Sequence, residues 1–168
     1  MPDYPVRKNL RLKTWDYTSG GTYFITICTK DRRHTLSAIV GGDAYIAPQV
    51  RLTPLGQLAE RHLSSIPGMI KFVVMPNHVH FLVTLERGPM RASAPTLTNV
   101  VRSFKTLVTK AWGTPVWQRG YHDHIIRNPD DFQTIWTYID QNPLKWELDR
   151  YYTDTEKERP PCRPSPPP

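Results

Sequence analysis

The chain has 168 residues, with 22 lysines and arginines against 15 aspartates and glutamates, and its formal net charge is +7. This length fits one ordinary domain, and 39% hydrophobic with 22% charged residues argues against a disordered polymer and a membrane protein. We find no apolar run of membrane-spanning length and no secretory signal. Two cysteines, Cys28 and Cys162, are too few for a disulfide framework, so we expect a reduced, cytoplasmic protein.

The positive charge gathers in two blocks of the sequence. Residues 1–33 hold seven basic and three acidic groups, and residues 87–127 hold seven basic groups and one acidic group. Residues 128–152 are instead net acidic, with two basic and five acidic groups. Clustered positive charge is typical of a protein that binds a polyanion, and a solvated basic surface without a partner is the alternative.

The N-terminal half predicts strands around one helix. Residues 22–29 are rich in β-branched and aromatic side chains and predict a buried strand. Residues 41–52 predict a turn and a short edge strand, because Pro48 cannot donate to a central ladder. Thr53 and Pro54 then predict the start of a helix that runs to about residue 65. Two strands, 71–75 and 78–85, follow and are joined by a tight turn.

The C-terminal half predicts two further helices. Residues 97–112 place apolar side chains at helical spacing, and residues 117–127 include a further short strand. Asn128 and Pro129 open a helix that Pro143 closes. We therefore expect an α+β fold with helices on one face of an antiparallel sheet. Residues 1–152 would form one domain with a basic N-terminal arm, and the proline-rich residues 153–168 would form a disordered tail.

The sharpest chemical feature is the pair His78 and His80 inside a predicted strand. Alternate side chains of a strand share a face, so both imidazoles would point the same way while Val79 points into the core. Two neutral imidazoles at this spacing can hold one divalent ion. Two ordinary surface histidines on an amphipathic strand are the alternative for this short motif.

The last predicted helix offers two further polar groups. Tyr138 and Asn142 are four residues apart and would share one face of that helix. Asn142 would offer an oxygen ligand to a metal, and Tyr138 would present a hydroxyl beside it. Alternatively, Tyr138 is a half-buried core residue and Asn142 only ends the helix.

Four blocks of the sequence resemble a known family. They are MPNHVHFLV (75–83), SFK (103–105), WQRGYHDHIIRNPDDF (117–132) and YIDQNP (138–143). Together and in this order they resemble the signature blocks of the HUH single-tyrosine transposases, and most closely the REP-associated tyrosine transposases. The resemblance covers residues 10–150 and implies a ferredoxin-like or RRM-like HUH nuclease fold.

The resemblance also implies roles for individual residues. His78 and His80 match the HUH pair and would ligate Mg²⁺ or Mn²⁺, with Asn142 as the third ligand. Tyr138 matches the nucleophile that forms a 5′-phosphotyrosine link to DNA. The implied substrate is single-stranded DNA folded as a hairpin, such as a repetitive extragenic palindrome, in a bacterial, nucleoid-associated setting. The protein would act as a monomer or a homodimer.

Basic residues supply candidate contacts to DNA phosphates. We expect them in the arm, along the helix 97–112 and in the block that follows it, at Arg7, Lys8, Arg11, Lys13, Arg102, Lys105, Lys110, Arg119 and Arg127. Aromatic residues interleaved with them could stack unpaired bases or belong to the core, namely Trp15, Tyr17, Trp117 and Tyr121. His124, Arg127 and Trp117 have either a structural or a DNA-contacting role.

Three other functions compete with a transposase-like nuclease. A replication-initiator-like nickase would use the same chemistry, but the short chain argues against it. A histidine-triad hydrolase would need a third alternating histidine, and that position is Leu82. A non-catalytic module that binds hairpin nucleic acid remains the alternative outside enzymes.

Overall fold

The computed structural model describes residues 20–41, 47–86 and 96–152. The predicted N-terminal arm, with Arg7, Lys8, Arg11 and Lys13, and the proline-rich tail lie outside the described residues, as do Trp15 and Tyr17. Among the described residues, none of the helices has the length and apolar character needed to cross a bilayer.

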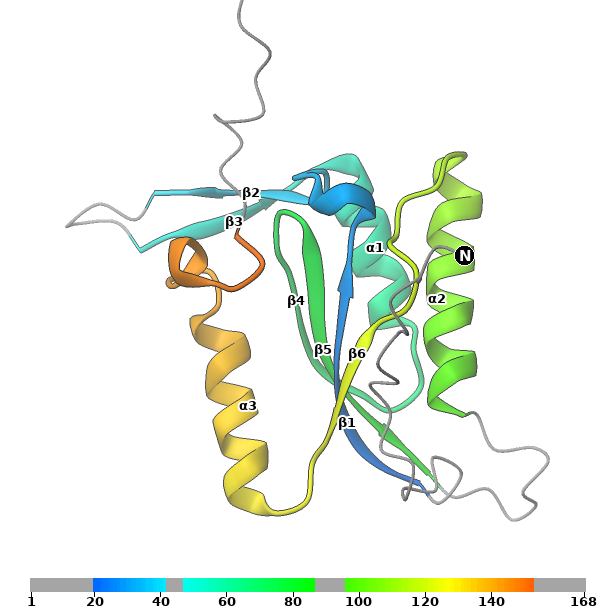
Figure 1. Cartoon of the computed structure of the whole chain (residues 1–168), viewed down its shortest axis with the longest axis vertical. Coiled ribbons are helices and arrows are strands. Elements are labelled where there is room, and N and C mark those ends of the chain that lie inside the picture. Colours follow the sequence, from blue (N-terminus) through cyan, green and yellow to red (C-terminus); the bar gives the residue numbers. More distant parts are fainter. Residues whose placement is uncertain (1–19, 42–46, 87–95, 153–168) are drawn as a thin grey trace, which may run out of the picture.

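A four-stranded antiparallel sheet forms the centre of the molecule (Figure 1). Its strands are β1 (Gly21–Cys28), β4 (Met69–Val74), β5 (His78–Leu85) and β6 (His122–Ile125), in the order β4-β5-β1-β6. The central pair is β1 and β5, which are aligned over their full lengths from Gly21 opposite Leu85 to Cys28 opposite His78. The predicted strands of this sheet are thus present, and the α+β fold class is confirmed.

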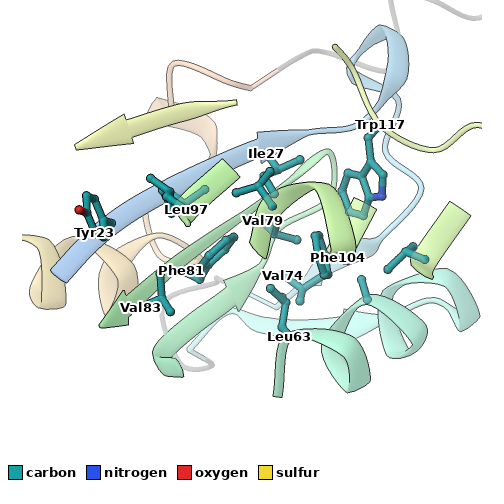
Figure 2. Close-up of a cluster of buried hydrophobic side chains, with 14 of the residues drawn as sticks. Tyr23, Ile27, Leu63, Val74, Val79, Phe81, Val83, Leu97, Phe104 and Trp117 are labelled. Atoms are coloured by element: carbon teal, nitrogen blue, oxygen red, sulfur yellow. The ribbon is translucent and has the colours of Figure 1, made fainter. Parts of the chain in front are cut away.

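Two helices cover one face of the sheet. These are α1 (Pro54–Ser64), which begins at the N-cap Thr53, and α2 (Leu97–Trp112), which ends at Gly113 in a left-handed conformation. Leu63 from α1 and Phe104 from α2 pack with Val79 and Phe81 of β5 in the hydrophobic core (Figure 2). Alternate residues of β5 therefore build this core, as the strand period requires.

The third helix, α3 (Pro129–Gln141), lies on the opposite face of the sheet (Figure 1). This corrects the expectation that all helices share one face. The physical reason is that β5 is buried on both sides, and its second face carries histidines in place of aliphatic side chains. Lys71 of β4 attaches α3 through Asp140, at 2.7 Å, and through the ring of Trp136, at 3.9 Å.

A small hairpin crosses one end of the sheet (Figure 1). It consists of β2 (Ser37–Val40), which the sequence did not predict, and β3 (Gln49–Leu52), the expected edge strand. The hairpin approaches α1 closely at Gly56, where an added Cβ would lie 1.9 Å from the backbone oxygen of Leu36. Only glycine fits at this crossing.

Candidate metal and tyrosine site

The strand register places the two histidines beside polar residues of β1 and β6. His80 lies opposite Thr26, Thr26 lies opposite His122, and His78 lies opposite Cys28. The rings of His78 and His80 are 4.4 Å apart between centroids, and both side chains are fully buried. The prediction that both imidazoles share a face is confirmed by this geometry.

Hydrogen bonds fix the tautomer of His78. Asn77 donates from Nδ2 to the backbone oxygen of Tyr151 at 2.7 Å, so its Oδ1 faces the imidazole. His78 Nδ1 lies 2.8 Å from that Oδ1, which can only accept, and must therefore carry the proton. His78 Nε2 then holds a lone pair, and this buried atom has no hydrogen-bond partner in the structure.

His80 is held from both sides of its ring. Its Nδ1 lies 2.8 Å from Thr26 Oγ1, and its Nε2 lies 3.3 Å from the hydroxyl of Tyr138. Because the Tyr138 hydroxyl donates its one proton to Asp149 Oδ2, its oxygen accepts from His80 Nε2, and His80 Nδ1 then accepts from Thr26 Oγ1.

Burial keeps both histidines neutral. It lowers the pKa of His78 to about 4, even though the carboxylate of Asp149 acts in the opposite direction. Burial also lowers the pKa of His80, and the neighbouring His78 and Arg150 add to that effect. Neutral imidazole is the form that binds a metal ion, so the pair is ready to act as ligands at neutral pH.

Helix α3 carries the two other predicted residues to this site. Its start is fixed by Asn128, whose Oδ1 accepts from the backbone N–H of Asp131 at 2.8 Å, and by Pro129 in the first turn. Tyr138 and Asn142 then lie one turn apart. Tyr138 is 37% exposed and so remains accessible to a ligand, whereas Asn142 is buried.

Asp149 joins these residues, and the sequence analysis missed it. One oxygen, Oδ2, accepts from the Tyr138 hydroxyl at 3.1 Å and from Asn142 Nδ2 at 3.2 Å. The other oxygen, Oδ1, accepts from the backbone N–H of Tyr151. Asp149 follows a short 3-10 helix, Trp146–Leu148, where no periodic pattern marks its neighbours.

His78, His80 and Asp149 meet as a potential metal-binding group. Each offers one ligand atom, and these atoms lie within 4.8 Å of one another. The Oδ1 atom of Asn142 is buried without a hydrogen-bond partner, like His78 Nε2. Buried polar atoms are rarely left unpaired, so these two atoms fit a site that is completed by a cation.

The environment of Tyr138 makes its hydroxyl a weak acid. Burial and the neighbouring carboxylate of Asp149 raise the pKa of Tyr138 to about 12. A cleft of about 410 Å³ opens beside it, lined on one side by Thr137 and Gln141 of α3 and on the other by Leu148 and Arg150. The tyrosine is therefore protonated at neutral pH and reachable from solvent.

The predicted DNA contacts lie in several places. Arg102 and Lys110 are exposed on α2, across the sheet from Tyr138, and Arg119 and Arg127 are exposed in connecting segments. Lys105 is engaged within the fold, because its Nζ donates to the backbone oxygens of Gln118 and Gly120. The structure does not bring the described members of this set together around the histidines.

Three residues whose role the sequence left open have contacts within the fold. His124 Nε2 lies 2.8 Å from Asp131 Oδ1, which ties β6 to the first turn of α3. Trp117 belongs to the core and packs against Phe104 at 5.3 Å between ring centroids. Tyr121 is partly buried against the same core.

Comparison with known proteins places this arrangement in a family. No protein-family model matches the chain. An uncharacterized protein of Haemophilus influenzae is 32% identical, with 88% of this chain and 94% of that protein covered. A REP-associated tyrosine transposase of Escherichia coli is 29% identical over 77% of this chain and 70% of its own length. A solved structure of a REP-associated tyrosine transposase bound to a REP hairpin is 26% identical. It covers 89% of this chain and 77% of that one, with a TM-score of 0.56.

The chain belongs to the REP-associated tyrosine transposase family. The family resemblance of the four sequence blocks is thereby confirmed, and so is the expected fold. As a member of this family, the protein is related to enzymes, and its buried histidines and Asp149 form a group that could hold a metal ion.

Proposed function

We propose that this protein is a metal-dependent endonuclease and strand transferase for single-stranded DNA that forms REP-type hairpins. The observation that carries the proposal is the contact of the Tyr138 hydroxyl with both His80 Nε2, at 3.3 Å, and Asp149 Oδ2, at 3.1 Å. A nucleophile beside a potential metal-binding group and a proton acceptor is the arrangement that phosphoryl transfer requires.

His78 and His80 would hold a divalent ion, and the remaining ligand oxygens would come from Asn142 and Asp149. When bound, the ion would stabilise the negative charge that develops on the phosphate oxygens. Imidazole ligands favour Mn²⁺ more than Mg²⁺, which prefers oxygen, and a carboxylate oxygen makes either ion acceptable.

Tyr138 would attack the scissile phosphorus through its phenolic oxygen. The new bond joins this oxygen to phosphorus, the bond from phosphorus to the 3′ oxygen breaks, and a 3′-hydroxyl leaves. DNA remains attached to Tyr138 through its 5′ phosphate. Since the phosphodiester energy is retained in this link, a later attack by a 3′-hydroxyl would rejoin the strands without ATP.

The proton of Tyr138 needs an acceptor. With a pKa of about 12, Tyr138 is almost entirely protonated at pH 7. Its hydroxyl must therefore lose the proton during the attack. Asp149 Oδ2 already accepts the hydroxyl hydrogen bond at 3.1 Å. We assign Asp149 as the general base that takes this proton during the attack.

A covalent-adduct assay tests the proposal. The protein is incubated with a REP hairpin that carries single-stranded flanks, with Mn²⁺ or with EDTA, and the products are separated on a denaturing gel. We expect a protein–DNA adduct with Mn²⁺ that Tyr138→Phe abolishes, while hairpin binding persists. Binding without an adduct in either divalent ion would support a non-catalytic hairpin-binding module instead.

The geometry supports a site completed within one chain, because Tyr138 and His80 of the same copy are in contact. Mixing Tyr138→Phe with His80→Ala should then restore no adduct, whether the protein is a monomer or a homodimer. Recovery of adduct in the mixture would mean that two copies share each site. With this substrate, we propose that the protein acts in the bacterial cytoplasm, at the nucleoid.

A further inference from the structure

Two arginines flank the histidine pair without being part of it. Arg32 follows β1, and its Cζ lies 5.6 Å from the centre of the Tyr151 ring. Arg150 lies 4.6 Å from the same ring centre and also donates to the Tyr151 hydroxyl. Tyr151 is buried, whereas both arginines are exposed residues. We call Arg32 and Arg150 the arginine pair.

Tyr151 connects the arginine pair to the metal-binding group. Its ring centroid lies 4.8 Å from that of His78 and 5.9 Å from that of His80. The two guanidinium groups are therefore separated from the histidines by a single aromatic ring. Arg150 also lines the cleft beside Tyr138, so a strand that enters this cleft lies next to this arginine.

The charges of the arginine pair affect the pKa values of neighbouring histidines. Arg150 and Arg32 both contribute to lowering the pKa of His78, where burial is the largest cause. They do the same for the pKa of His122, which lies on the same face of the sheet. Arg150 also acts to lower the pKa of Tyr138, against the larger opposite effects of burial and of the Asp149 carboxylate. The pair therefore adds positive charge beside the tyrosine without outweighing Asp149 there.

The backbone at Arg32 is held in a strained conformation. Asp31 and Arg32 have φ values of 58° and 53°, in the left-handed region that side chains other than glycine rarely adopt. The turn is fastened by Thr29, whose Oγ1 donates to the backbone oxygens of Arg33 and Asn77. Strain of this kind is concentrated at functional sites. Here it holds Arg32 over Tyr151.

We propose that Arg32 and Arg150 together bind the backbone phosphates of the single strand that passes the His78–His80 site. A guanidinium group matches phosphate with two parallel hydrogen bonds, and it keeps its charge at every relevant pH. The predicted cations on α2 lie across the sheet from Tyr138, so they cannot supply this contact. The inference rests on the proposed function, because it assigns a role to residues around the same site.

The test measures the salt dependence of binding in EDTA. A fluorescently labelled REP hairpin with single-stranded flanks is titrated with wild type, Arg32→Gln and Arg150→Gln at several salt concentrations. We expect each variant to bind roughly tenfold more weakly, as loss of a charged hydrogen bond implies. The slope of log affinity against log salt should become shallower by about 0.7 for each lost phosphate contact.

Matched variants separate the pair from general charge effects. Arg33→Gln removes the neighbouring charge of the same turn, and Arg61→Gln removes an exposed charge on α1. Both should retain the wild-type slope. Arg32→Lys and Arg150→Lys keep the charge and should also keep the slope, while binding more weakly because the paired hydrogen bonds are lost. Circular dichroism and the Mn²⁺-induced shift in melting temperature report whether each variant is folded.

The outcomes distinguish this inference from the proposed function. One outcome is that Arg32→Gln and Arg150→Gln show the same salt-dependence slope as Arg33→Gln while wild type forms the adduct. The proposed role of the arginine pair would then be wrong, and the proposed nuclease function would still hold. If the slope falls but wild type never forms an adduct, the pair is a DNA-binding element of a non-catalytic protein. If the lysine variants show the same slope loss as the glutamine variants, the pair acts through the fold, and the inference is wrong.

Discussion

The sheet face that meets α1 and α2 is filled by aliphatic and aromatic side chains, whereas the face that meets α3 carries His78, His80 and Thr26. Both faces exclude water from β5. On the first, every buried apolar atom contributes to folding. On the second, two buried polar atoms are unpaired, at His78 Nε2 and Asn142 Oδ1, whereas the described part of the apolar core has one, at Trp117 Nε1. Each such atom costs about 1–3 kcal/mol. The first face stabilises the fold and the second gives up stability for chemistry.

The largest expected effect comes from truncating the apolar face. Phe81→Ala should lower the free energy of unfolding by about 3–5 kcal/mol, because the fully buried ring would leave a cavity among residues of α2 and β5. Phe24→Ala is the matched substitution on the histidine face, where Phe24 packs beside His80 and Tyr138 and is only partly buried. Urea denaturation measures both variants. A larger loss for Phe24→Ala would reverse the roles that we assign to the two faces.

The next effect concerns the metal. Mn²⁺ at one hundred times its dissociation constant should raise the free energy of unfolding by about 2.7 kcal/mol, and EDTA should remove that gain. His80→Ala should abolish the response, while His62→Ala on α1 keeps it. Thermal melts with and without Mn²⁺ provide the measurement. An unchanged response in His80→Ala would show that the ion binds elsewhere.

A smaller effect concerns the acidity of Tyr138. Removing the negative charge of Asp149 makes the phenolate of Tyr138 easier to form, so Asp149→Asn should lower the Tyr138 pKa from about 12 toward its usual value of 10.0. The ultraviolet titration of Asp149→Asn, minus that of Asp149→Asn with Tyr138→Phe, isolates this one tyrosine. Asp140→Asn on the same helix should leave the titration unchanged. A Tyr138 pKa that stays near 12 in Asp149→Asn would leave burial as the sole cause.

The smallest effect concerns the connection between β6 and α3. The hydrogen bond from His124 lowers the pKa of Asp131, so this carboxylate stabilises the fold above its unfolded pKa of about 3.9. That contribution is lost as pH falls through the lower folded pKa. Asp131→Asn should therefore reduce stability at neutral pH by less than about 1 kcal/mol and flatten its decline in acid.

Stability measured by urea at several pH values tests this prediction. Asp130→Asn is the control, because it removes a carboxylate from the same first turn of α3 and reports the helix-dipole contribution alone. Equal acid slopes in the two variants would contradict a specific role for the His124–Asp131 contact.

Sequence patterns predicted the regular parts of the molecule well. The apolar stripe of 97–112 marks α2, and the alternation of His78, Val79 and His80 correctly divides β5 between the two faces. The segment Asn128–Pro129 marks the start of α3. Each of these signals lies within a short stretch of sequence, so it can be recognised without knowledge of the fold. The short strand β2 has only four residues and carries too little pattern to be recognised.

The residues that complete the site follow no such pattern. Asp149 and Arg150 lie in an irregular segment after Pro143, and Arg32 occupies a strained turn. Their positions depend on contacts with residues far away in sequence, such as the bond from Asn77 to Tyr151. Arg150 was also not predicted as a site residue, because residues 128–152 are net acidic and a charge total does not show which cation lies near the histidines.

The hydrogen bond between Asn77 and Tyr151 has a consequence for the order in which the site forms during synthesis. The β1–β5 pair and its helices α1 and α2 are all encoded before residue 113, and domains generally fold as their segments leave the ribosome. Strand β6 emerges afterwards, followed by Tyr138, Asn142 and Asp149, and these segments dock against the β1–β5 pair. A chain interrupted before residue 138 therefore carries both histidines but lacks Tyr138, the proposed nucleophile. Under the proposed function, the chain would gain its activity on DNA only after α3 and the segment with Asp149 have been synthesised and docked.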